Sequence, residues 1–250
     1  MITNRLKSIV ENPMLIRKIV YAINKAVTQD IPQYNRENRL ETNNRNRFAA
    51  GDFINENLRQ HVVKGEVALI PFKRNAWEGR IIVDRENKIT YSIVTHRNLR
   101  AIFEKPRKQP HYLMTLLSIE NDDCESSLKQ MTLGEFVPDF KVDTFETEVL
   151  EEDFDNIMQG SISRTDGYKH YIIAYTFEQR EITKIELILL DKDFDFVDRL
   201  DVREYVMPDF ASLTDGEYEE PEKEEAEQEA RPSLLKLREG VKPVLSLMKE

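Results

Sequence analysis

The chain has 250 residues, of which 40% are hydrophobic and 33% are charged, so it is long enough to bury a core in one large domain or two small ones. Its single cysteine, Cys124, excludes an intramolecular disulfide framework and a thiolate metal cluster. No run of 18 apolar residues is present and the N-terminus lacks a signal-peptide core, so we expect a soluble cytoplasmic protein.

The net charge of -10 is distributed unevenly along the chain. Residues 1–110 hold 21 Lys and Arg against 11 Asp and Glu, whereas the remaining residues hold 15 against 35. This asymmetry predicts a cationic surface for a polyanion and an acidic part that shields it or binds a basic partner. The other interpretation is two solvated surfaces that attract each other weakly.

The N-terminal part is predicted to be helical. Apolar residues recur every three or four positions from Met14 to Gln29, which indicates a core-packing helix with a basic outer face. Asp30 to Pro32 is predicted to break it. A second helix is predicted to begin at Asp52, with its apolar positions Ile54, Leu58 and Val62 facing inward.

Between these helices lies a segment rich in asparagine and arginine. Asn35 to Arg47 holds five Asn and four Arg, and its only apolar residue is Leu40. Such a segment cannot bury itself, so we expect a mobile loop or an arm that becomes ordered on a nucleic acid. Arg45 and Arg47 are candidates for contacts with phosphates or base edges.

The clearest structural signal is the stretch from Glu66 to His96. It predicts three antiparallel strands, Val67 to Phe72, Arg80 to Asp84 and Lys88 to Thr95. The connection from Lys73 to Gly79 carries two adjacent cations, Lys73 and Arg74, and the only tryptophan, Trp77. We predict that this connection is a functional loop.

A short helix from Leu99 to Phe103 is followed by a second basic loop, Lys105 to His111, which its prolines keep irregular. Cations interleaved with aromatic residues are typical of proteins that bind single-stranded nucleic acids. No RNP, KH or helix-turn-helix signature accompanies them. The predicted nucleic-acid contacts are Arg45, Arg47, Lys73, Arg74, Trp77, Arg97, Arg107 and Lys108.

The acidic half predicts a helix from Glu148 to Met158 and then a three-stranded meander. The meander strands are Tyr171 to Phe177, Ile182 to Leu190 and Phe194 to Val202. They either extend the first sheet or form a second lobe. We divide the chain into a basic part (1–120), an acidic part (121–212), an acidic linker (213–232) and an amphipathic C-terminal segment (233–250).

The C-terminal segment has apolar residues at helical spacing, which are Leu234, Leu237, Val241, Leu245 and Met248. We expect this apolar face either to dock on the body of the protein or to bind a groove of a partner protein.

Catalytic motifs are sparse. Asp84, Glu86 and Lys88 match the Glu-x-Lys spacing of a magnesium nuclease, but all fall within one turn, so we predict neither a metal nor another cofactor. A metal-independent enzyme acting on RNA or a nucleotide would use His96 or His111, with Arg97 or Arg107 as the phosphate clamp.

The stretch PFKRNAWEGRIIVD, followed by NKITYSIVTH, resembles uncharacterised proteins of Gram-positive bacteria and their phages. The resemblance covers about the middle third of the chain and implies no activity. It implies a genetic setting among mobile elements, such as toxin and antitoxin pairs, antiviral defence or its inhibition.

The sequence as a whole predicts an α+β fold, in which N-terminal helices pack on an antiparallel sheet, a second antiparallel meander follows, and a C-terminal helix is tethered. Our first hypothesis is a non-enzymatic factor that binds nucleic acid or protein in a phage-related conflict system. The alternatives are the His96 or His111 enzyme and an acidic interaction protein or DNA mimic that binds a basic partner. The oligomeric state stays open.

Overall fold

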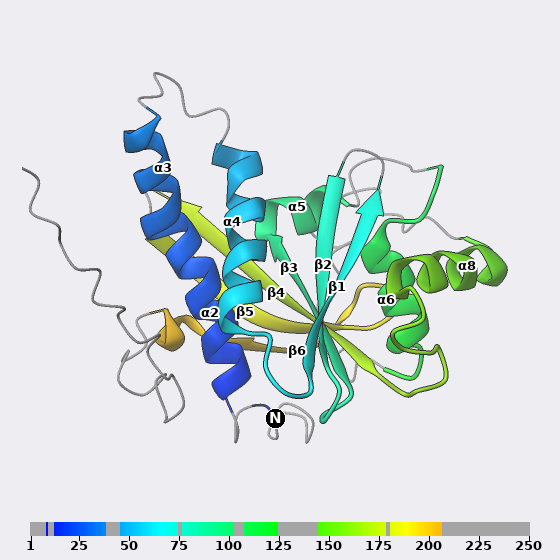
Figure 1. Ribbon diagram of the computed structural model, residues 1–250. Helices are drawn as coiled ribbons and strands as arrows, with labels where there is room; N and C mark the ends of the chain where they lie inside the picture. Colours follow the sequence, from blue (N-terminus) through cyan, green and yellow to red (C-terminus); the bar gives the residue numbers. More distant parts are fainter. Residues whose placement is uncertain are drawn as a thin grey trace, which may run out of the picture. The chain divides into compact units, whose positions relative to one another are not determined.

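The computed structural model describes residues 9, 13–38, 46–74, 77–102, 108–124, 145–178 and 181–206 (Figure 1). The described helices are α2 (Met14–Lys25), the π-helical turn η1 (Ala26–Asp30), α3 (Ile31–Glu37), α4 (Asn46–His61), α5 (His96–Ala101), α6 (Tyr112–Glu120), α8 (Thr147–Met158) and the 3-10 turn η2 (Arg203–Tyr205). The described strands are β1 (Val67–Arg74), β2 (Trp77–Asp84), β3 (Ile89–Thr95), β4 (Lys169–Glu178), β5 (Glu181–Leu190) and β6 (Phe196–Asp201).

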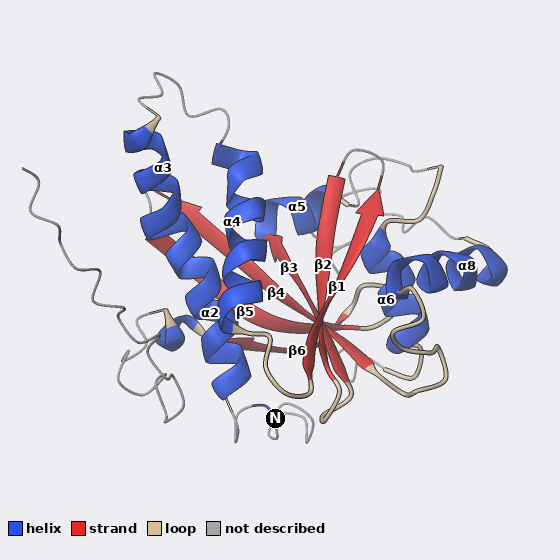
Figure 2. Cartoon of the chain, in the orientation of Figure 1, coloured by secondary structure: helices blue, strands red, loops and turns tan. Residues whose placement is uncertain are grey.

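The six strands form one sheet in the order β1-β2-β3-β4-β5-β6 (Figure 2). All neighbouring strands are antiparallel except β3 and β4, which run parallel because the chain crosses over between them through α5, α6 and α8. The second meander therefore extends the first sheet. The predicted α+β fold, with N-terminal helices on a mostly antiparallel sheet, is confirmed.

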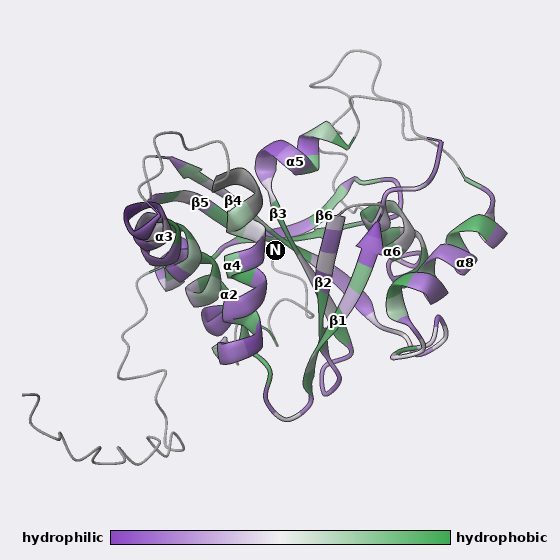
Figure 3. Cartoon of the chain, turned by 45° about the horizontal axis from the view of Figure 1, so that its top comes forward, coloured by the Kyte–Doolittle hydropathy of each residue, from purple (hydrophilic) through white to green (hydrophobic). Residues whose placement is uncertain are grey.

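Both faces of the sheet are covered, and each has its own apolar core. The N-terminal helices α2 and α4 pack on the face that carries Tyr91, Tyr171 and Leu187. Helices α5, α6 and α8 cover the opposite face, which carries Ile81 and Ile172. Because both faces of β4 and β5 are buried, these strands contain nearly continuous apolar runs, as expected for central strands. In Figure 3 hydrophobic and hydrophilic stripes alternate along α8.

The predicted break at Asp30 to Pro32 is wrong, because α2 continues through η1 into α3. Pro32 lies in the first turn of α3, directly after the π-helical turn, and the helix continues through it although its nitrogen has no hydrogen to donate. The wide turn η1 brings Asp30 back to Lys25, whose ammonium lies 2.8 Å from the Asp30 carboxylate. Asn57 of α4 donates to the same carboxylate at 2.7 Å and fixes the turn against α4.

The asparagine-rich segment is also shorter than predicted. Residues 35–37 belong to α3, and α4 begins at Asn46, six residues before the predicted start at Asp52. Glycine at position 51 is therefore inside the helix. The inward positions Ile54, Leu58 and Val62 are buried as predicted.

A buried side chain connects α6 to the centre of the sheet. The amide nitrogen of Asn121 donates to the carbonyl oxygens of His170 and Leu190, at 2.9 and 2.7 Å, and its amide oxygen accepts from the backbone N–H of His170 at 2.8 Å. Asn121 is fully buried. One side chain thus fixes the end of α6 against both β4 and β5.

Candidate nucleic-acid interface

The predicted functional loop is shorter in the structure than in our interpretation of the sequence. Strand β1 runs to Arg74 and β2 begins at Trp77, so that only residues 75 and 76 lie between the strands. The longer connection that we predicted is wrong, because Lys73 pairs with Glu78 and Arg74 with Trp77 across the hairpin. Trp77 is consequently held by a strand at the tip of the hairpin.

Trp77 is exposed but rigidly packed. It is 48% exposed, one of three large hydrophobic residues exposed in the described part of the chain. Its indole stacks on the ring of Tyr112, with the ring centres 5.6 Å apart and the planes inclined by 29°. The ring of Phe72 meets the indole edge-on at 5.4 Å, and His111 lies 4.5 Å from Tyr112. Two buried aromatic rings, those of Tyr112 and Phe72, therefore support an indole whose remaining surface faces solvent.

Gly79 makes this position of the indole possible. A Cβ atom at residue 79 would lie 2.6 Å from Cη2 of Trp77 and 2.7 Å from Cε1 and Cζ of Phe72. These distances are below any real carbon contact, so every other residue type would displace the two rings. The aromatic group depends on the absence of a side chain at this one position.

The cations predicted around Trp77 have different roles. The Lys73 side chain is 68% exposed and lies 3.7 Å from Glu78, and Lys108 is exposed. Arg74, by contrast, forms an ion pair with Asp153 of α8 and donates to the carbonyl oxygen of Pro110 at 3.3 Å. Its side chain is only 25% exposed. Arg74 therefore fastens the hairpin to α8, while Lys73 and Lys108 face solvent.

Helix α5 adds cations near the same end of the sheet. Arg97 and Arg100 are exposed, and neither forms an ion pair with a carboxylate among the residues in the structure's described ranges. The sequence prediction included Arg97 and missed Arg100. The two arginines are three residues apart, and this spacing would have indicated that both lie on one side of a helix. Our predicted helix began at Leu99 instead of His96, so it did not include Arg97.

The two candidate catalytic histidines differ in their surroundings. Nδ1 of His111 accepts the backbone N–H of Leu113 at 3.2 Å, so His111 caps α6. His96 lies between two side chains, with Nδ1 at 2.9 Å from the Thr176 hydroxyl and Nε2 at 2.9 Å from the Glu186 carboxylate. Both ring nitrogens of His96 are thus engaged within the chain, by a hydroxyl and by a carboxylate, whereas His111 caps a helix.

Glu186 is the charged partner in this group. Its carboxylate also lies 2.7 Å from the Lys184 ammonium. Burial opposes the ionisation of Glu186, but the hydrogen bonds from Lys184 and His96 outweigh it and lower the pKa of the carboxyl. Glu186 is therefore an anion whose charge is supported by its contacts with Lys184 and His96.

A further histidine is closed to solvent. His170 is fully buried, and its Nδ1 lies 2.7 Å from the hydroxyl of Thr90, which also donates to Glu120. No substrate can reach these side chains in the folded chain. The group therefore belongs to the core, and the accessible histidine chemistry is that of His96.

The elements that carry the predicted basic segments end at the same edge of the molecule. The β1–β2 tip, α5, the end of α3 and the start of α4 all lie at the top in Figure 1. Arg74 bonds to Pro110, which brings the residues before α6 to the same tip. The hairpin tip and the residues before α6 thus meet at the end of the sheet that holds Trp77, whereas α3 and α4 lie to the left of the tip in Figure 1.

Some predicted residues cannot be located. Arg45, Arg107 and the C-terminal residues Leu234, Leu237, Val241, Leu245 and Met248 lie outside the described residues. Arg47 lies in the first turn of α4, and its side chain is outside the described part. The interface that can be described consists of Trp77, its aromatic support, Lys73, Lys108, Arg97 and Arg100.

Comparisons with known proteins give a family without an assigned activity. In the described residues, no helix is long and apolar enough to cross a membrane. Neither the curated proteins nor the solved structures contain a match to the chain. A family of unknown function, DUF5986, matches residues 8–250, which confirms the predicted relationship to uncharacterised proteins. The chain belongs to the DUF5986 family.

Proposed function

We propose that the protein is a non-enzymatic factor that binds single-stranded nucleic acid at the end of the sheet that carries Trp77. The observation that supports this function best is the half-exposed Trp77 indole, stacked on buried Tyr112 and flanked by exposed Lys73. An indole held in this way offers a preformed surface to a base. Little side-chain entropy is lost when the base stacks on it.

The magnitudes favour a single strand over a duplex. Stacking of one base on an aromatic side chain contributes about 1–3 kcal/mol, and it requires an unpaired base. Lys73, Lys108, Arg97 and Arg100 provide charge for the phosphates, which adds a sequence-independent and salt-dependent attraction. We propose Arg45, Arg47 and Arg107 as further phosphate contacts. Arg74 is left out, because its guanidinium is already paired with Asp153.

Fluorescence anisotropy with labelled single-stranded RNA, single-stranded DNA and duplex DNA tests this function. We expect Trp77→Ala to weaken binding of the single strands by about tenfold or more, and Trp77→Phe to weaken it less. Lys73→Ala removes one of the proposed phosphate contacts. Its matched control is Lys192→Ala, because Lys192 is exposed in the turn between β5 and β6, at the opposite end of the sheet. Equal affinity of the wild type and Trp77→Ala for every probe would refute the proposal.

The pairing of His96 with Glu186 favours a second candidate, a metal-independent enzyme acting on RNA. In this reaction, the ribose 2′-hydroxyl replaces the Thr176 hydroxyl at Nδ1 of His96, which takes its proton, and the ribose oxygen attacks the adjacent phosphorus. The bond from phosphorus to the 5′-oxygen breaks, the leaving oxygen takes up a proton from water, and His96 returns its proton to the solvent. A cyclic phosphate and a 5′-hydroxyl result. Arg97 and Arg100 would bind the phosphate.

Incubation of labelled RNA with the wild type, His96→Ala and Glu186→Gln, each in the presence of a chelator, tests the second candidate. The enzyme requires cleavage by the wild type, complete loss in His96→Ala and a reduced rate in Glu186→Gln. Intact RNA after incubation with the wild type eliminates this candidate and leaves the binding function unaffected.

The cellular setting and the remaining alternative stay predictions. A role in a phage-related conflict system rests on the sequence resemblance to proteins of Gram-positive bacteria and their phages. The alternative of an acidic interaction protein or DNA mimic depends on the acidic half of the chain, of which the acidic linker lies outside the described residues. A salt-sensitive pull-down of a basic partner by the full chain would support that alternative.

A further inference from the structure

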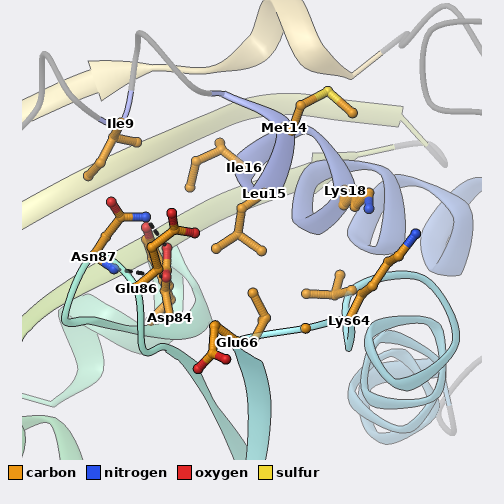
Figure 4. A pocket seen from close by; sticks show the side chains of 14 residues that line it. Ile9, Met14, Leu15, Ile16, Lys18, Lys64, Glu66, Asp84, Glu86 and Asn87 are labelled. Carbon is orange, nitrogen blue, oxygen red and sulfur yellow. Dashed lines mark hydrogen bonds between the residues drawn. The ribbon is translucent and has the colours of Figure 1, made fainter. Parts of the chain in front are cut away.

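A cavity of about 430 Å³ opens at the end of the sheet opposite Trp77 (Figure 4). Its walls come from the start of α2, the link between α4 and β1, and the turn between β2 and β3. Cavities of about 300–1,000 Å³ are typical of small-molecule sites. This cavity shares no residue with the proposed nucleic-acid interface.

The middle of the cavity is apolar. Leu15 and Ile16 of α2 line it from one side, Val67 of β1 from another, and Tyr91 of β3 also contributes to the lining. Ile9, which precedes α2 in the sequence, is 7% exposed and also lines the cavity. Such a lining fits an aliphatic or aromatic group of a ligand and excludes a highly charged one.

One end of the cavity is acidic. Asp84 is only 5% exposed, and its two carboxylate oxygens accept hydrogen bonds from the backbone N–H and the side-chain amide of Asn87, at 3.1 and 2.7 Å. In the described residues no cation forms an ion pair with Asp84. Glu86 lies beside it in Figure 4. A buried carboxylate without a counter-charge is costly, so an ammonium group at this end would be stabilised.

The opposite end is basic. Lys18 of α2 and Lys64 of the link line the cavity away from Asp84 and Glu86, with the apolar side chains between the two ends (Figure 4). The cavity thus has carboxylates at one end and ammonium groups at the other, with apolar side chains between them, and the exposed Glu66 also lines it. A molecule with an ammonium group, an apolar body and a carboxylate is complementary to the two ends and the apolar side chains.

We propose that this cavity binds a short apolar peptide through its charged N-terminus and C-terminus. The ammonium group of the ligand lies beside Asp84 and Glu86, its side chains contact Leu15, Ile16 and Tyr91, and its carboxylate lies near Lys18. The inference rests on the cavity alone and does not depend on the proposed nucleic-acid binding.

Isothermal titration of the full chain with four probes tests the ligand class. The probes are leucine, leucyl-leucine, N-acetyl-leucyl-leucine, which lacks the ammonium group, and leucyl-leucine amide, which lacks the carboxylate. We expect leucyl-leucine to bind more tightly than either blocked form, by about tenfold for each lost charge. No heat of binding for leucyl-leucine up to about 1 mM, or equal binding of leucine, whose two charged groups are attached to one carbon atom, would overturn the proposal.

Charge variants at the surface of the cavity test the location. Glu86→Gln and Lys18→Gln should each weaken binding of leucyl-leucine by about tenfold. Glu152→Gln on α8 is the matched control, because Glu152 is exposed and lies outside the cavity. Unchanged affinity in both cavity variants would overturn the proposal, as would equal binding of the N-acetylated probe.

A filled cavity provides an independent check. Leu15→Trp places a larger side chain into the lining and should abolish binding while the helical circular dichroism is retained. If this variant fails to fold, the two charge variants decide, since Lys18 and Glu86 belong to neither apolar core. Retained binding in a folded Leu15→Trp variant contradicts the proposed site.

Discussion

Gly79 determines how Trp77 is presented. Its replacement by alanine creates contacts of 2.6 and 2.7 Å with the rings of Trp77 and Phe72. We expect Gly79→Ala to lower the free energy of unfolding by about 1–3 kcal/mol and to change the fluorescence of Trp77. Urea unfolding followed by circular dichroism measures the first effect, and the emission spectrum of the folded protein measures the second.

Gly51→Ala is the control for this prediction, because a Cβ atom at residue 51 has no neighbour within 4 Å and the residue lies inside α4. It should stabilise the protein by about 0.5–1 kcal/mol, as alanine is the better helix former. A Gly79→Ala variant that is as stable as the wild type would show that the rings do not pack as described.

Glu186 makes the free energy of unfolding depend on pH in the acid range. Its pKa in the folded chain is below the ordinary value of 4.5, so the folded form holds its charge at pH values where the unfolded chain takes up a proton. The stabilisation is present above about pH 4.5 and is lost as the pH falls below it. Glu186→Gln should therefore lose less stability than the wild type between neutral pH and the acid range.

Thermal unfolding of both proteins at a series of pH values measures this difference. The midpoints of the wild type and Glu186→Gln should differ most near neutral pH and converge as the pH falls. A constant difference across the series would mean that the carboxyl group of Glu186 has the same pKa in the folded and unfolded chains.

At the scale of single residues, the sequence indicated which side chains are exposed better than it indicated which side chains contact each other. We predicted Trp77 in a functional loop with Lys73 and Arg74, and Trp77 is exposed although the loop is shorter than predicted. The partner of Arg74 could not be inferred, because Asp153 is 79 residues away and only the packing of α8 on β1 brings them together. The same holds for His96, which meets Glu186 across 90 residues.

Among the elements, apolar periodicity predicted the strands and the longer helices, but it did not predict how they begin and end. Trp77 lies in β2 because cross-strand pairing extends to the tip, and pairing is a property of two strands together. Pro32 did not end a helix, because the chain changes to a π-helical turn just before it and proline is tolerated in the first turn of α3. Local sequence contains neither fact.

The attachment of α6 depends on Asn121. Asn121→Ala removes three hydrogen bonds and leaves backbone groups of His170 and Leu190 without these partners in a buried site. We expect a loss of about 2–4 kcal/mol, which for a chain of this size lowers the melting temperature by several degrees. Thermal unfolding followed by circular dichroism measures it. Asn156→Ala on α8 is exposed and should change stability little, and similar losses in both variants would contradict this role of Asn121.

In the whole molecule, the direction of the strands brings the functional elements together. The sequence predicted both meanders but left open whether they share a sheet. The structure joins them through the parallel pair β3 and β4, so α5 and the tip of the first hairpin lie at the same end. The order and direction of strands follow from long-range packing, so a pattern of alternating residues cannot predict them.

Salt dependence tests whether the cations act together. If Lys73 and Lys108 each neutralise one phosphate, the double variant Lys73→Ala and Lys108→Ala should reduce the slope of log affinity against log salt by about 1.4. Anisotropy titrations with a single-stranded probe between about 50 and 200 mM salt measure the slope. Lys192→Ala should leave it unchanged, and an unchanged slope in the double variant would exclude these two lysines from the interface.

The most direct measurement uses the fluorescence of Trp77, which is the only tryptophan in the chain. Titration of the unlabelled wild type with a single-stranded oligonucleotide at low salt should quench its emission in a saturable way, and added salt should restore the emission. A duplex of the same sequence should quench it less, because its bases are already stacked. Unchanged emission at every concentration of single strand would contradict the proposed function.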